Sequence, residues 1–257
     1  MNAGVDDPTP EPPGSRLARA RVAFARGLRN LLAPEGLPSG ASAELESAFG
    51  DIGREVLATG PGRVRRVRGQ VAAAPPKLLD WMSTQVVDHP AVLYDVAGVE
   101  ALSGRQTKSI QTAVGALQLA LVGAAAASTL EGGPFVAIAI DGVVGQVAAV
   151  VHGLCDWYNT GSYLVRRLDQ EGLSADVGEV RRLTNAVLMS KGRTVDDRML
   201  SGSTEFRLVR RWAGSGLVDA LPFGSSLGRA SVKAAERIDH TDLARTLAAL
   251  RMEPVGP

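Results

Sequence analysis

A serine between two glycines is the first feature of this sequence that matches a known catalytic arrangement. Residues 224–228 (GSSLG) have the Gly-x-Ser-x-Gly pattern of the hydrolase nucleophile elbow, where a strained turn between a strand and a helix presents the serine, here Ser226. The preceding LVDALPF is short and interrupted by proline, and the only later histidine is His240, directly after Asp239. We therefore expect a Gly/Ser turn that begins a helix and keep a serine hydrolase as a minor alternative.

Metal binding is the second kind of chemistry to consider, since the chain holds three histidines and one cysteine. His152 and Cys155 stand three residues apart in an apolar segment, which places both on one face of a helix. A metal site needs further ligands, and neither His-Glu-x-x-His nor Cys-x-x-Cys occurs in the sequence. A Walker-type phosphate loop is also missing. We expect no metal, no cofactor and no catalytic residue, and we interpret His152 as a packed core residue.

Asp141 is an acidic residue that the sequence places deep inside an apolar segment. Between Ser109 and Cys155 the only charged residues are Glu131 and Asp141. A carboxylate buried between helices must find a partner or stay neutral, because an isolated buried charge costs more than folding supplies. Asp141 is therefore our candidate buried polar residue. A structural hydrogen bond is the first interpretation, and an ion or proton role is the second.

The segment around Asp141 predicts an apolar helical hairpin over residues 109–155. Residues 131–134 (EGGP) divide it into two arms, each close to the length of about 20 residues that spans a bilayer. Small residues recur every four positions on each arm, a spacing that allows close helix packing. They are Thr112, Ala116, Ala120, Ala124 and Ser128, then Ala137, Asp141, Gly145, Ala149 and Gly153.

The flanks of the hairpin leave its environment open. Trp157, Tyr158 and Tyr163 follow the second arm, and two arginines come after them, a pattern typical of a membrane interface. Asp141 would cost about 2.5 to 3.5 kcal/mol in a bilayer, and alanine and glycine offset little of that. The hairpin is therefore either the core of a soluble bundle or a membrane-inserted element.

Residues 16–32 predict a basic amphipathic helix. At 100° per residue, Leu17, Phe24, Leu28 and Leu31 fall on one side of it. The opposite side carries the candidate contacts with an anionic membrane surface, Arg16, Arg19, Arg26 and Arg29.

Composition indicates an all-α protein in a reducing compartment. The chain is 45% hydrophobic but only 4% aromatic, which favours packed helices over an aromatic-rich sheet. A single cysteine excludes an internal disulfide framework, and the net charge of +1 gives no global attraction to nucleic acid. We predict a disordered Pro-rich acidic tail over residues 1–15 and one multi-helix bundle over 16–257, built around the hairpin.

Three segments resemble the EcsC family, which is named after a bacterial protein encoded beside an ABC transporter. They are the hairpin around GGPFVAIAID, residues 156–188 (from DWYNTG to LTNAVL), and residues 219–251 (from DALPFG to TLAALR). The matching positions are Gly132, Gly133, Asp141, Tyr158, Leu221, Pro222 and Gly224; Asn159 replaces a usual glycine, and a phenylalanine stands between Pro222 and Gly224. The resemblance covers roughly the second half of the chain. It implies an α-helical, membrane-associated accessory protein with no assigned reaction.

These patterns favour a non-enzymatic helical accessory protein. We expect it in the cytoplasm, peripheral to the inner face of the cell membrane, with an anionic membrane surface or a membrane protein complex for transport or secretion as its partner. The alternative is a soluble helical scaffold or interaction protein whose hairpin is simply its buried core.

Overall fold

Every regular element that the structure describes is a helix, which confirms the predicted all-α class. The computed structural model describes residues 15–33, 41–59, 75–91, 95–127, 133–190, 195, 199–201, 203–214, 232–233, 235–237 and 240–252. Its helices are α1 (Ser15–Leu31), α2 (Ala41–Thr59), α4 (Pro75–Asp88), α5 (Val96–Ala127), α6 (Gly133–Gln170), α7 (Val177–Ser190), α8 (Ser203–Gly214) and α10 (His240–Met252). The predicted tail lies outside these residues, except Ser15, which begins α1.

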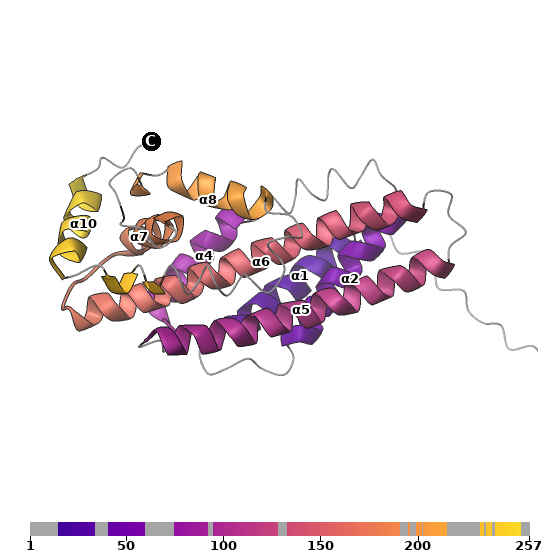
Figure 1. The fold of residues 1–257 in the computed structure, drawn as a ribbon, viewed down its shortest axis with the longest axis horizontal. Helices are drawn as coiled ribbons and strands as arrows, with labels where there is room; N and C mark the ends of the chain where they lie inside the picture. The colour runs from indigo at the N-terminus through magenta and orange to yellow at the C-terminus, as the bar shows by residue number, and fades with distance from the viewer. Residues whose placement is uncertain are drawn as a thin grey trace, which may run out of the picture.

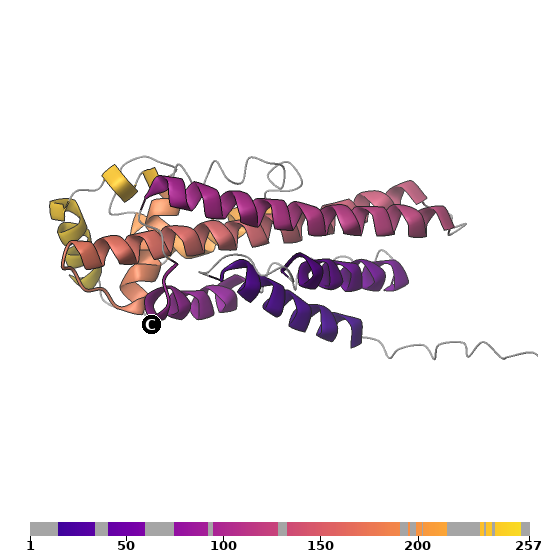
Figure 2. The same ribbon diagram turned by 90° about the horizontal axis from the view of Figure 1, so that it is seen from below.

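The long antiparallel pair α5 and α6 forms the centre of the molecule (Figure 1). Helices α1, α2 and α4 lie in a layer beneath this pair (Figure 2), and α7, α8 and α10 gather around the second half of α6. The predicted hairpin is therefore present, but both arms are longer than residues 109–155. Helix α5 starts earlier, at Val96, and α6 continues to Gln170.

Residues 145–164 of α6 are all buried, on every side of the helix. Helix α6 as a whole packs against α2, α4, α5, α7 and α8. This burial corrects the interpretation of the aromatic flank: Trp157, Tyr158 and Tyr163 lie inside α6, at most 7% exposed, rather than at a helix end. An apolar segment followed by aromatics matches a membrane interface in sequence, but here neighbouring helices cover the aromatic rings.

One glycine of the small-residue ridge on the second arm lies at a close helix contact. At Gly153 the neighbour is the Trp212 ring of α8, and a Cβ placed on this glycine would lie 2.5 Å from it. On the first arm, Thr112 is exposed and its hydroxyl donates to the Lys108 carbonyl at 2.9 Å. Gly153 thus provides a close approach for α8.

A buried pair of side-chain amides sets the register of α5 against α6. Asn159 Nδ2 donates to Gln106 Oε1 at 2.8 Å, and Gln106 Nε2 donates back to Asn159 Oδ1 at 3.3 Å. Gln106 Nε2 also donates to the carbonyl of Leu31, at the end of α1, at 3.2 Å. Buried amides need such partners, so one longitudinal position of α5 along α6 satisfies both groups.

The turn from α6 to α7 is built from standard helix-end contacts. Gly172 has a positive φ of 68°, and Leu173 N donates to Leu168 O at 2.9 Å, the pattern of a Schellman motif. Helix α7 is then capped by Asp176, whose carboxylate accepts from Glu179 N at 2.7 Å while Glu179 accepts from Asp176 N at 3.0 Å. Ser174, a residue type common at helix starts, lies two residues before Asp176 and outside this reciprocal pair.

The tight contact at Gly153 gives a stability prediction. Gly153→Ala forces the new methyl group into the Trp212 ring, and such overpacking costs about 1 to 3 kcal/mol. Gly115→Ala is the matched control, because a methyl group added to this glycine of α5 would meet nothing within 4 Å, and alanine favours helix by about 0.5 to 1 kcal/mol. Urea unfolding should show the two substitutions moving stability in opposite directions. Equal midpoints for the two variants would contradict the packing of α8 on α6.

Candidate functional site: the arginine face of helix α1

Helix α1 lies with its apolar side against the bundle. Ala20, Leu28 and Leu31 are at most 2% exposed, and Phe24 packs against the same core. Gly27 allows α2 to come close, since a Cβ there would lie 2.9 Å from Leu45. The apolar side of the predicted amphipathic helix is therefore occupied by its own domain.

The outward side of α1 combines arginines with small apolar residues. Its exposed residues are Ala18, Arg19, Arg21, Val22, Ala25, Arg26 and Arg29. Val22 is 53% exposed, and the helix contains no acidic residue. We call these seven residues the arginine face. Such a face can place guanidinium groups against anionic groups while its small apolar residues make shallow contact.

Arg19 has a structural contact in addition to its exposed position. Its Nε donates to Asp51 Oδ2 at 3.4 Å, and Arg54 donates to Asp51 Oδ1 at 2.7 Å. The Asp51 side chain is only 5% exposed, whereas the two arginines are 49% and 60% exposed. The ion pair between Arg19 and Asp51 links α1 to α2. Removing Arg19 would take one cationic partner away from the buried Asp51 carboxylate.

The four arginines predicted from the sequence are therefore not equivalent. Arg26 and Arg29 are exposed, Arg19 is shared with Asp51, and Arg16 is half-buried and has a polar contact of its own. Arg21 belongs to the face but was missed, because the helical wheel places it beside Leu28. It is exposed because it lies near the end of α1 where Leu17 and Phe24 are only half-buried.

The other residues singled out from the sequence do not form a described site. The backbone of Asp141 lies in α6, but its side chain is outside the described residues, as are Ser226 and the whole of 224–228. Helix α10 begins at His240, whose side chain is likewise not described. Within the described residues, no group of three His, Cys, Asp or Glu is placed to hold a metal ion. None of the described helices is both long and apolar enough to cross a membrane.

Asp156 is a buried acid that the sequence interpretation overlooked. It lies one turn after His152 on α6, and the two side chains are 8% and 6% exposed. Burial raises the pKa of the Asp156 carboxyl well above its ordinary value of 3.8 and lowers the pKa of His152 to about 4. His152 Nε2 has no hydrogen-bond partner. His152 is therefore neutral near pH 7, and burial shifts the Asp156 carboxyl toward its protonated form. The apolar character of the segment around both residues was the signal in the sequence.

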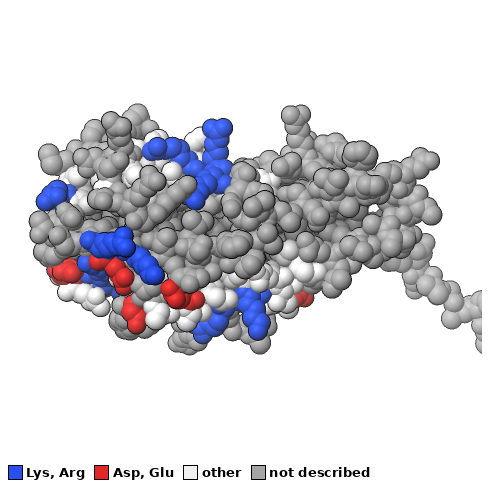
Figure 3. Space-filling view, viewed as in Figure 1, with Lys and Arg blue, Asp and Glu red and all other residues white. Residues whose placement is uncertain are grey.

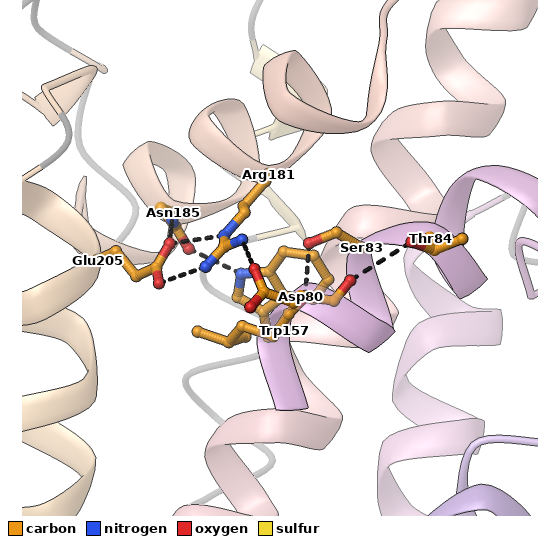
Figure 4. A network of polar contacts seen from close by, with 8 residues as sticks. Asp80, Ser83, Thr84, Trp157, Arg181, Asn185 and Glu205 are labelled. Carbon is orange, nitrogen blue, oxygen red and sulfur yellow. Dashed lines mark hydrogen bonds and ion pairs between the residues drawn. The ribbon is translucent and has the colours of Figure 1, made fainter. Parts of the chain in front are cut away.

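A polar network joins α4, α7 and α8 to the central helix α6 (Figure 4). Arg181 of α7 donates to Glu205 of α8 at 2.6 and 2.5 Å and also to Asp80 of α4. Asn185 donates to Glu205 at 3.4 Å and accepts from Trp157 Nε1 of α6 at 2.8 Å. These bonds satisfy the polar groups and form a structural clamp that holds α4, α6, α7 and α8 together.

Comparison of the chain with protein-family models, curated proteins and solved structures finds no match in any of the three. The resemblance to the EcsC family stays an expectation drawn from the sequence motifs.

Asp156 predicts an unusual pH dependence of stability. Its folded pKa is raised, so above about pH 4 the folded state keeps a proton that the unfolded state releases, and stability falls as pH rises. Asp156→Asn imitates the protonated carboxyl, so the variant should be more stable than the parent at neutral pH. This gain should shrink as the pH is lowered toward about 4.

Urea unfolding over a pH series, with the exposed Asp88→Asn as control, measures this difference. His152 has the opposite effect, because its lowered pKa removes stability as pH falls from about 6.5 to 4, but it is present in both proteins. A stability difference between parent and Asp156→Asn that is the same at every pH would refute the raised pKa of Asp156.

Proposed function

We propose that this protein is a non-enzymatic, peripheral membrane accessory protein that contacts an anionic membrane surface through the arginine face of α1. The observation that carries the proposal is the composition of that face: four arginines, exposed Val22 and two alanines on a helix without acids. The resemblance to the EcsC family supports the same role, on the cytoplasmic side of the cell membrane and beside a transport or secretion complex.

The packing of α1 defines how such a contact would work. Leu28 and Leu31 are buried against the bundle, so they are not available to lipid unless α1 detaches. Binding would then rest on charge and on the shallow contact of Val22. Each basic side chain near an anionic surface contributes about 1 kcal/mol, and salt screens this attraction. The proposed attachment is reversible and sensitive to ionic strength.

A soluble helical scaffold is the second candidate. It is favoured by the burial of residues 145–164 on all sides of α6, which gives the apolar segment a place inside the bundle. In that case the arginine face would dock an acidic protein surface instead of a bilayer. The same experiment separates the two, because the membrane proposal requires binding to protein-free vesicles.

Vesicle binding tests the proposal through three arginines. The triple change Arg21→Gln, Arg26→Gln and Arg29→Gln leaves Arg19 in place, so Asp51 keeps its partner. At about 1 kcal/mol per arginine, it should weaken binding to phosphatidylserine-containing vesicles roughly 100-fold at low salt. Cosedimentation of the full chain across a salt series measures the effect.

The matched control removes the same charge elsewhere, with Lys77→Gln, Arg105→Gln and Lys108→Gln, all exposed residues of α4 and α5. It should keep most of the binding. If the parent does not bind these vesicles, or if both triple variants lose binding equally, the arginine face is not the membrane contact.

A further inference from the structure

A second cationic face lies on α8 and carries an exposed aromatic ring. Phe206 is 70% exposed, more than any other large apolar side chain in the described part of the chain. Arg207 and Arg210 beside it are also exposed. Figure 3 shows basic side chains projecting over α8 at the upper edge of the molecule. We call these three residues the α8 face.

The acid of α8 is turned away from this face. Glu205 is the one acidic residue of the helix, and both of its carboxylate oxygens accept from Arg181 of α7. Glu205 also accepts from Asn185, so its charge is used inside the clamp shown in Figure 4. The outward side of α8 therefore carries positive charge without a balancing acid from its own helix.

The α8 face is held rigidly by the inward side of the same helix. Thr204, Leu208 and Val209 are buried, and the Trp212 ring lies against the α6 backbone at Gly153. Arg207 is steadied along the helix by contacts with the hydroxyls of Ser203 and Thr204 at 3.5 and 3.2 Å. A fixed face loses little conformational entropy when a partner binds.

We propose that the α8 face is the docking site for an acidic, apolar-containing segment of a partner protein. A single exposed phenylalanine is ordinary, but aromatic and arginine side chains together are the residues enriched at the centres of protein interfaces. Carboxylates of the partner would pair with the guanidinium groups of Arg207 and Arg210, and an apolar side chain would cover Phe206.

The choice of a protein over a lipid surface rests on the proposed function. Helix α8 lies along the edge of α6 that faces away from α5 in Figure 1, whereas α1 lies in the layer beneath the pair in Figure 2. A molecule that is attached to a membrane through the arginine face of α1 would therefore present the α8 face, which lies on a different side, to other partners.

Fluorescence anisotropy with a labelled peptide of alternating glutamate and leucine tests the docking site on the full chain. The parent should bind this peptide and not its lysine-for-glutamate counterpart. Phe206→Ala, and separately the pair Arg207→Gln with Arg210→Gln, should each weaken binding about tenfold or more, the scale of an interface hot spot. All three side chains are exposed, so the variants should unfold at the parent's temperature.

Two controls make the outcome decisive. Arg105→Gln with Lys108→Gln removes equal charge from α5 and should leave peptide binding unchanged, as should the triple arginine variant of α1. The proposal is overturned if the parent does not bind the peptide, or if the α5 control loses as much as the α8 variants. It is also overturned if Phe206→Ala impairs vesicle binding instead. Vesicle binding by the α1 variant reports separately on the membrane proposal.

Discussion

The complete burial of residues 145–164 in α6 is the constraint on which the other helices depend. A helix buried on every side must offer each neighbour either apolar surface or a matched polar group. Asn159 meets Gln106 of α5, and Trp157 meets Asn185 of α7. Tyr158 donates its hydroxyl to the carbonyl of His89 at the end of α4, at 3.1 Å. Three surrounding helices are thus positioned by polar side chains within three consecutive residues.

In the second half of the chain, arginine side chains connect the helices to one another near their ends. Arg167 donates to Ala235 O at 2.5 Å, and Arg182 donates to Leu250 O at 3.0 Å. Arg251 of α10 donates to Glu179 at 2.6 Å and to Ser174 O at 2.8 Å, which holds α10 against the start of α7. The hydrogen bond from Arg251 is the largest cause of the lowered pKa of Glu179. Leu250 O lies in the last turn of α10, where carbonyls lack intrahelical partners, and the guanidinium group of Arg182 supplies one.

The arginines differ in what they contact, and this difference connects the fold to the proposed role. Arg181, Arg182 and Arg251 are engaged in contacts between helices, whereas Arg26 and Arg29 face outward from α1 and Arg210 from α8. The near-zero net charge of the chain therefore conceals two local cationic faces on different sides of the bundle. A contact through the arginine face rests on a helix whose apolar side is already packed, which favours reversible attachment over insertion.

The helical class and the positions of α1 and the hairpin follow from local patterns in the sequence. Periodicity predicted residues 16–32 where α1 spans Ser15–Leu31, and α4 begins at the proline pair before Lys77, where proline suits a first helical turn. These features are local, because hydrophobic spacing and proline geometry act within a few residues. Composition likewise identified the apolar hairpin, although the true helices extend beyond it because α6 continues through its aromatic residues.

The role of each side chain, in contrast, depends on how the helices pack. The sequence cannot distinguish Arg19, which is shared with Asp51, from Arg26, which faces outward, because both lie on the same side of one helical wheel. It also cannot show that Gly153 meets the Trp212 ring, or that burial raises the pKa of Asp156. Each of these facts depends on residues far away in the chain. Burial and partner choice are set when α2, α7 and α8 close around the central pair, and no local pattern encodes that arrangement.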